Sequence, residues 1–263
     1  MNNVTFDSNS FSKELGVYDF FNVLLSGATF VCGLCIVSKD IKCLLWSELS
    51  FLKGLGLILL IYLLGMVMQD IGSLMDKHFF KIYQGMNQKI LKGEIGHGFR
   101  SKTNNYIIKN PLVLTRYRSN ADALLSEFNI KNDKNRFDND FVNGYIFSVC
   151  QYYVSVTGKD KKVEKMRALF AMSKSLMACF FVLAAIMFLC VFTNTTPSVD
   201  IVGFLGLSSV DCAKCVTKVF LSISFAGMGF LFIVRAKRTM KNFLLILLGT
   251  YDAIVRSREN NVS

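Results

Sequence analysis

The chain has 263 residues, of which 52% are hydrophobic, with 24 Phe and only 2 Pro, and its mean hydropathy is +0.40. This composition argues against an ordinary soluble domain and indicates an integral membrane protein. The formal net charge is +11, from 30 Lys and Arg against 19 Asp and Glu, so the placement of the basic residues can indicate an orientation in the membrane.

The N-terminal segment leads into a first apolar run. Residues 1–20 carry three acidic side chains against one lysine and no small-residue cleavage site, so we expect no cleavable signal peptide. Residues 20–38 then lack any charge and are long enough to cross the roughly 30 Å hydrocarbon core as a helix. We predict the first of four transmembrane helices here.

Polar residues recur on one face of this first span. Asn22, Ser26 and Thr29 lie at positions i, i+4 and i+7, which places them on one side of a helix. Small and weakly polar residues let helices approach closely in lipid, which is the packing interpretation. Polar groups in hydrocarbon are otherwise costly, so the alternative is that this face lines a water-filled pore in an oligomer.

A second apolar run covers residues 54–69 and must extend past Lys53 and Asp70 to cross a bilayer. Lys53 can reach the interface from the end of a helix. Asp70, near the inner end, either forms a ring at a pore mouth or marks an interfacial helix end. The candidate pore-lining residues are therefore Asn22, Ser26, Thr29 and Asp70.

Residues 76–169 are too polar to lie in a membrane, but their apolar residues recur with helical spacing. The pattern appears in four segments: 76–93, 119–128, 138–156 and 160–170. In the first segment Phe79, Ile82, Met86 and Ile90 fall on one helical face. The last segment runs into the next apolar span. We therefore predict an all-α chain with a helical domain inserted between spans 2 and 3.

A cluster of basic and tyrosine side chains occupies this insert. Its members are Arg100, Lys102, Tyr106, Lys109, Arg116, Tyr117 and Arg118. Basic residues beside a membrane can simply contact anionic lipid. Alternatively, the cations bind the phosphates of a nucleotide or a short single strand, and its bases stack on the tyrosines. This cluster is our candidate polyanion site.

Two more spans are predicted at residues 175–192 and 219–234. The tail that follows is basic, then apolar, then amphipathic, and we expect it to pack on the insert or a neighbouring subunit, or to lie in the membrane interface. Cys212 and Cys215 lie in the connection between these two spans. In an oxidising compartment they could form a local disulfide.

Basic residues are concentrated in two regions outside the spans. The insert holds 17 Lys and Arg against 9 Asp and Glu, and the residues after Val234 hold 6 against 2. By the positive-inside rule both regions face the cytoplasm, and with four spans the N-terminus does too. The predicted parts are spans 1 and 2 at 1–75, the basic cytoplasmic domain at 76–169, spans 3 and 4 at 170–234 and the cytoplasmic tail at 235–263.

Residues suited to catalysis or metal binding are scarce. His78 and His97 have no ligand-spaced Cys or carboxylate nearby, so we expect no metal site. The segment GEIGHGF (93–99) follows a predicted helix rather than a strand and lacks the Lys and Ser/Thr of a phosphate-binding loop. No nucleophile in the sequence has an identifiable base. We predict neither an enzyme nor a cofactor.

The start of the first span resembles the opening of bacterial four-span proteins encoded in anti-phage defence systems. The matching residues in LGVYDFFNVLLSGATFV are Tyr18, Asp19, Phe20, Phe21, Leu25 and Gly27. Ser26 stands where that pattern has Pro. The order of two spans, a basic insert, two spans and a tail is also similar to membrane effectors partnered with nucleotidyltransferases, including those of Hailong-type systems.

This resemblance implies an oligomeric channel in the bacterial inner membrane, whose opening depolarises an infected cell and aborts the infection. In the Hailong-type case it also implies that short single-stranded DNA made by the partner nucleotidyltransferase binds the cytoplasmic domain and holds the channel shut. We therefore expect a homo-oligomer, favouring a tetramer, that conducts ions or permeabilises the membrane under the control of a nucleotide or oligonucleotide. A membrane scaffold that recruits a soluble partner through the insert is the alternative.

Overall fold

The computed structural model describes the backbone of residues 8–46, 51–82, 86, 90–91, 110–127, 140–158, 161–192, 197 and 210–260. Every regular element among these residues is a helix, which confirms the predicted all-α class. The chain divides into two compact units. The first unit is Met1–Asp76 with Ala168–Ala236, and the second unit is Lys77–Arg167 with Lys237–Ser263.

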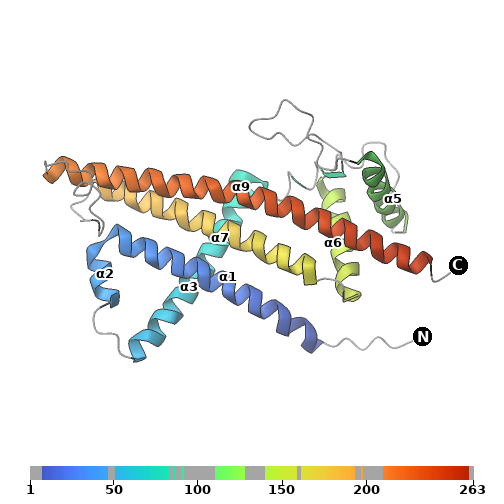
Figure 1. Ribbon diagram of the computed structural model, residues 1–263, viewed down its shortest axis with the longest axis horizontal. Coiled ribbons are helices and arrows are strands. Elements are labelled where there is room, and N and C mark those ends of the chain that lie inside the picture. The colour runs from blue at the N-terminus through green and yellow to red at the C-terminus, as the bar shows by residue number, and fades with distance from the viewer. Residues whose placement is uncertain are drawn as a thin grey trace. The chain divides into compact units, whose positions relative to one another are not determined.

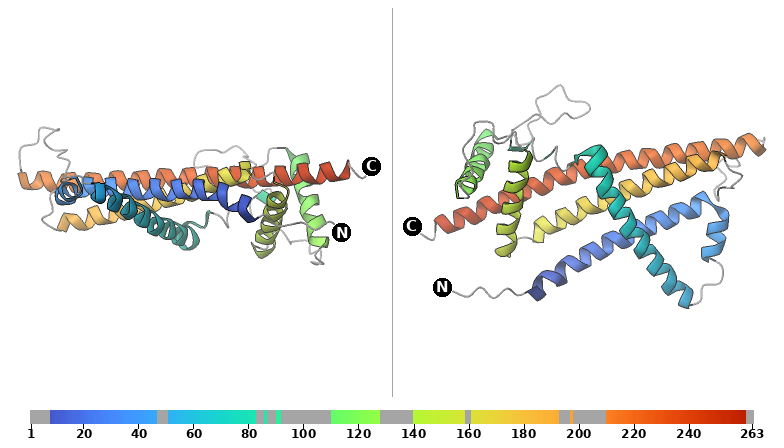
Figure 2. Two further views of the ribbon diagram at one scale, coloured as in Figure 1. Left: turned by 90° about the horizontal axis from the view of Figure 1, so that it is seen from below. Right: turned by 180° about the vertical axis from the view of Figure 1, so that it is seen from behind.

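Among the described residues, five α-helices contribute to the first unit. They are α1 (Ser8–Val37), α2 (Lys39–Trp46), α3 (Phe51–Met75), most of α7 (Lys161–Leu189) and the first part of α9 (Val210–Glu259). In this unit α7 and α9 run side by side and α3 crosses α1 (Figures 1 and 2). A short 3-10 helix, η3 (Cys190–Phe192), continues the end of α7. The ammonium of Lys218 donates to the carbonyl oxygen of Cys190 at 2.7 Å, and so stabilises a helix C-terminus that has no intrahelical donor.

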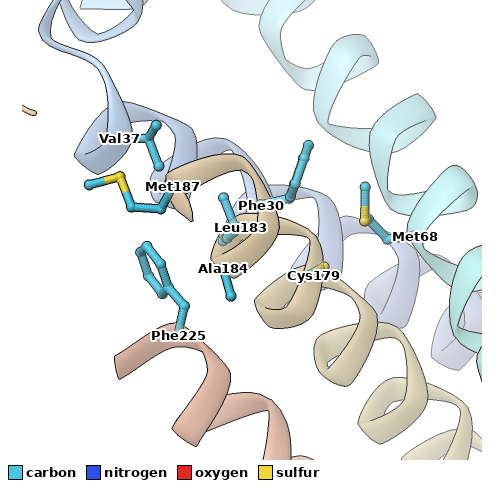
Figure 3. Close-up of a cluster of buried hydrophobic side chains, with 8 residues drawn as sticks. All are labelled: Phe30, Val37, Met68, Cys179, Leu183, Ala184, Met187 and Phe225. Atoms are coloured by element: carbon cyan, nitrogen blue, oxygen red, sulfur yellow. The ribbon is translucent and has the colours of Figure 1, made fainter. Parts of the chain in front are cut away.

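A buried apolar cluster holds α1, α3, α7 and α9 of the first unit together (Figure 3). Its members are Phe30, Val37, Met68, Cys179, Leu183, Ala184, Met187 and Phe225. In the most apolar window of each candidate span, 44% of the α7 residues are buried, against 22% for α9 and 11% for α3. Of these three helices, α7 is therefore the most buried and α3 the least.

In the described part of the chain, three helices are long and apolar enough to cross a membrane, as expected for a membrane protein. They are Phe51–Phe80, Lys161–Phe192 and Cys215–Arg258, and they contain the predicted second, third and fourth spans. The predicted first span lies in the 30-residue helix α1. There the apolar helix Asn22–Val37 is shorter than the other three within the part whose side chains are described, so the first span stays a prediction.

Helix α9 is unbroken over 50 residues, whereas the sequence pattern predicted a fourth span that ends at Val234 and a separate tail segment. The intervening residues RAKRTMK contain neither Gly nor Pro, and Ala, Arg, Lys and Met all favour helix. The basic residues of this segment end the apolar stretch, but the helix continues through them. The tail of α9 belongs to the same unit as the insert, which is one of the arrangements expected for it.

The second unit contains the π-helix η1 (Asp76–Phe80) from Lys77 onward, then α5 (Pro111–Glu127), α6 (Asp140–Val156) and the tail of α9. Helix α5 begins at Pro111, eight positions before the predicted start at 119. Its first turn is fixed because the side-chain oxygen of Asn110 accepts the backbone N–H of Leu112 at 3.0 Å. Asn at the N-cap followed by Pro at the first helical position is a strong helix start.

The apolar face predicted for residues 76–93 is wrong at Phe79. Ile82 and Ile90 are only 3% and 0% exposed, but Phe79 is 78% exposed. The reason is local backbone geometry. Phe79 lies in a π-helix, and Lys81 directly after it has a φ of 45°. Both features break the 3.6-residue register on which the prediction rested.

Candidate functional site

Two polar residues of the predicted pore face, Asn22 and Ser26, point into the first unit. Both are buried. The side-chain amide of Asn22 donates to the carbonyl oxygen of Ala168 at 3.0 Å. The hydroxyl of Ser26 donates to the carbonyl oxygen of Val23 at 2.9 Å and lies 3.4 Å from that of Gly65. These bonds are those of helix packing, the alternative left open for this face.

Two glycines bring α1 and α3 into close contact at this point. A methyl group at Gly27 would collide with the carbonyl group of Ile61, and one at Gly65 would collide with the carbonyl group of Val23. Small residues that let helix backbones touch are typical of helix interfaces in membranes. Ser26 therefore lies at the crossing of α1 with α3, whereas Asn22 bonds to α7.

The other two predicted pore residues are more accessible. The Thr29 hydroxyl donates to the carbonyl oxygen of Leu25 at 2.8 Å, and the side chain is half-buried. Asp70 of α3 is exposed, and no described cation forms an ion pair with it. The structure thus separates the four residues into a buried pair on α1, a half-buried Thr29 and an outward-facing Asp70.

A second aspartate, Asp76, lies in η1, which continues α3, and unlike Asp70 it is buried. Asp76 is 5% exposed, and its carboxylate lies 3.9 Å from the ammonium of Lys174 on α7. Lys174 in turn lies over the ring of Phe170, 4.9 Å from its centroid. Since both side chains are largely buried, their charges compensate each other within the protein. Asp70 has no comparable arrangement among the described residues.

In the second unit, three polar groups converge on the carboxylate of Asp252 in the tail of α9. The guanidinium of Arg116 on α5 lies 2.7 Å from it, and the side-chain amide of Asn120 donates to it at 2.9 Å. Arg256, one turn further along α9, lies 3.3 Å from the second oxygen. Asp252 is 13% exposed, whereas Arg116 and Arg256 are 38% and 54% exposed. The two arginines therefore remain open to solvent around a covered carboxylate.

Of the other predicted polyanion residues on α5, Tyr117 and Arg118 are both partly buried. Burial and, secondly, the charge of Asp252 raise the pKa of Tyr117 above its usual value, so the phenol stays protonated at neutral pH. The Arg118 guanidinium donates to the carbonyl oxygen of Leu91 at 2.7 Å. Arg118 thus fastens α5 to the residues after η1, while Arg116 faces the tail of α9.

Aromatic rings extend this arginine cluster across α6. The ring of Tyr153 lies 5.9 Å from that of Tyr251 on α9 and 6.2 Å from that of Tyr152. Arg258 lies over the ring of Tyr153, 5.6 Å from its centroid. Tyr152 is 61% exposed. Tyr251 is buried and Tyr153 is half-buried, so Tyr152 is the ring of the three on which a base could stack beside the exposed cations.

A depression beneath the cluster, lined in part by Tyr117, Cys150 and Tyr251, leaves no room even for a water molecule. Burial raises the pKa of the Cys150 thiol to about 12, so the thiol is neutral at physiological pH. A ligand of this cluster would therefore bind on its surface.

No protein-family model, no curated protein and no solved structure matches this chain. The side chains that converge on the tail of α9 were missed in the sequence analysis: Asn120, Tyr153, Asp252, Arg256 and Arg258. The one available signal was the Asp252 and Arg256 spacing of i and i+4, which is typical of helical ion pairs.

The remaining predicted site residues divide by location. Arg100, Lys102, Tyr106 and Lys109 lie outside the described residues, as does the side chain of Cys212. Cys215 is exposed on α9 with a free thiol, and a bond between it and Cys212 stays a prediction. Within the described part of the chain, no group of three His, Cys, Asp or Glu side chains is placed to hold a metal ion.

Proposed function

We propose that this chain assembles as a homo-oligomer, a tetramer by preference, around a water-filled path through the bacterial inner membrane. In this proposal α1 also crosses the membrane, as the first of four spans, and the second unit lies in the cytoplasm with both termini. A nucleotide or short single-stranded DNA bound to the second unit controls opening. Opening depolarises an infected cell, in keeping with the resemblance of residues 15–31 to anti-phage effectors.

The outward-facing Asp70 carries the proposal. It lies within the candidate span Phe51–Phe80 and seven positions before Lys77, which is about 10 Å along a helix axis. A carboxylate facing hydrocarbon costs up to about 3 kcal/mol. A water-filled path between copies removes that cost, because the carboxylate is then hydrated. An exposed acidic ring is also a usual means of attracting cations to a pore.

The same face of α3 supports a polar lining. Ser73 follows Asp70 at i+3 within α3 and is exposed like it, so both lie on one side of the helix. Asn22 and Ser26 already bond to groups of their own unit, which favours α3 over α1 as the helix that lines the path.

Control by a polyanion is supported by the arginine cluster of the second unit. Arg116 and Arg256 present partly exposed guanidinium groups, and these groups pair with carboxylate and phosphate alike. A phosphate that engages them competes with the carboxylate of Asp252. Since Asp252 lies on the same unbroken helix as the candidate fourth span, this competition alters a helix that also belongs to the first unit.

The test is conductance of the full chain in planar bilayers, with and without a short single-stranded oligodeoxynucleotide on the side of the second unit. We expect discrete currents that the oligonucleotide changes. Asp70→Asn should lower the preference for cations over anions by roughly tenfold, because an acidic ring concentrates counter-ions. Asp40→Asn, which removes an exposed carboxylate on α2 outside the candidate spans, should leave that preference unchanged.

Ligand control is tested separately by binding of the same oligonucleotide. Arg256→Gln should weaken binding and reduce its salt dependence by about one charge. Asp252→Asn should instead strengthen binding about threefold to fivefold, because it removes the competing carboxylate of a partly exposed ion pair. Lys161→Gln, at an exposed site on α7, is the matched control. Folded oligomer without current under any condition would contradict the channel and favour a membrane scaffold.

A further inference from the structure

Helix α3 continues into η1, and together they form one helical rod, Phe51–Phe80, which we call the α3 rod. Its C-terminal end carries an exposed aromatic ring between exposed basic side chains. Phe79 is 78% exposed, and Lys77 and Lys81 are exposed on either side of it. We call Lys77, Phe79 and Lys81 the terminal patch. An exposed ring of this size is unfavourable in water, so the patch needs a partner that accepts both an apolar ring and two cations.

The backbone keeps Phe79 away from the core of the second unit. The π-helix η1 and the left-handed backbone at Lys81 turn Phe79 away from the face that buries Ile82 and Ile90. The exposure of Phe79 therefore follows from an ordered helix end, which holds the two lysines next to the ring.

The opposite end of the same rod carries a similar group. Phe51 and Leu52 are 84% and 79% exposed, and Lys53 is exposed beside them. The rod from Phe51 to Phe79 spans roughly 40 Å at 1.5 Å per residue. A bilayer with its headgroup regions is about 40–45 Å thick. The length therefore places the two aromatic ends in opposite headgroup layers, with the more basic end at the terminal patch.

We infer that the terminal patch binds the anionic headgroups of membrane phospholipids. The ring of Phe79 inserts at the boundary between headgroups and acyl chains, and the ammonium groups of Lys77 and Lys81 contact lipid phosphates. Phe with Lys at the end of a span suits this chemistry, because the ring prefers the lipid boundary and the lysine stems reach outward from it. This inference is independent of channel activity and of the polyanion proposed for the arginine cluster.

The test uses the full chain, purified in detergent and stripped of lipid. Binding of dioleoylphosphatidylglycerol and of dioleoylphosphatidylcholine is measured by native mass spectrometry, with glycerol phosphate as a soluble source of the same headgroup chemistry. We expect tighter binding of the anionic lipid. The double variant Lys77→Gln/Lys81→Gln should weaken that binding about 25-fold, or about fivefold per lysine, and leave binding of the zwitterionic lipid unchanged.

A matched pair and an aromatic variant complete the design. Lys161→Gln/Lys162→Gln removes the same charge at two exposed positions of α7 and should change anionic lipid binding less than about twofold. Phe79→Ser should weaken binding of both lipids, because the ring contributes without regard to headgroup charge. Unchanged helical circular dichroism shows that each variant is folded.

Three results would overturn the inference. Equal loss from the two double variants would mean a general effect of net charge. Displacement of the lipid by glycerol phosphate at comparable concentration would mean a site for soluble phosphate. Loss of oligonucleotide binding, with anionic lipid binding intact in Lys77→Gln/Lys81→Gln, would assign the two lysines to the polyanion.

Discussion

The two faces of the α3 rod carry similar residues in opposite environments. One face buries Gly65, Met68, Gly72 and Asp76 against the rest of the first unit. The other face leaves Gly56, Asp70 and Lys77 exposed. Glycine and aspartate occur on both faces, so residue type does not distinguish them. What distinguishes them is the neighbour that each residue meets, which is backbone and a lysine on one face and open space on the other.

This difference shows how polarity should be interpreted in a membrane helix. A buried aspartate beside a lysine serves packing, and an exposed aspartate needs water or another chain. The same reasoning separates the bonded Asn22 and Ser26 from Asp70. The same substitution made once on each face of the rod therefore tests this comparison directly.

The largest effect is expected where the helix backbones touch. Gly65→Leu introduces a side chain into the carbonyl group of Val23, so the crossing of α1 and α3 must open. We expect a loss of more than about 3 kcal/mol of stability, or no folded protein. Thermal unfolding in detergent measures this. Gly56→Leu is the control, because nothing lies within 4 Å of that position, and its stability should stay within about 1 kcal/mol. Equal losses would contradict the assigned faces.

A smaller effect is expected from the two aspartates. Asp76→Asn leaves the largely buried Lys174 without its carboxylate, and breaking such a pair costs about 3 kcal/mol. Asp70→Asn should change stability by less than about 0.5 kcal/mol, because the side chain is exposed. Unfolding of the two variants under one set of conditions gives the comparison. If the double variant Asp76→Asn/Lys174→Met recovered none of the lost stability, the pair would not be the cause.

The last effect concerns a buried thiol and is absent at neutral pH. Since the pKa of Cys150 is raised from 9.0 to about 12, the folded state holds the proton that the unfolded state releases above pH 9. This contribution to stability is complete below pH 9 and is lost as the pH rises toward 12, by at most about 1.4 kcal/mol per pH unit.

Cys150→Ala should therefore show a shallower loss of stability between pH 9 and pH 11 than the parent chain, as measured by thermal unfolding.

In the native protein a maleimide should label the exposed Cys43 and leave Cys150 unmodified until unfolding. Rapid labelling of Cys150 in the native state would contradict its burial.

Periodicity and length predicted the helical class and the helices that contain the second, third and fourth spans, because these depend on residues close in the chain. The start of α5 also had a local signal, the Asn110 and Pro111 pair, which the apolar pattern alone did not reveal. The face of Phe79 was predicted wrongly because periodicity assumes a regular α-helix, and η1 is not one.

The candidate site was less predictable for a different reason. The Asn22, Ser26 and Thr29 face was visible in the sequence, but its partners are Ala168 and Gly65, which lie far along the chain. Arg116 was found through its local charge, whereas its partner Asp252 is more than a hundred residues away. Such pairings depend on how the helices pack. Because most of these helices are apolar, the hydrophobic pattern of a single sequence is compatible with many different packing arrangements.

The left-handed backbone at Lys81 lowers the stability of the folded chain. A side chain in that conformation costs about 1 kcal/mol or more, which glycine would avoid. Glycine at this position would therefore make the chain more stable and remove one of the two cations beside Phe79. If the terminal patch binds lipid as proposed, stability and membrane attachment therefore oppose each other at this residue.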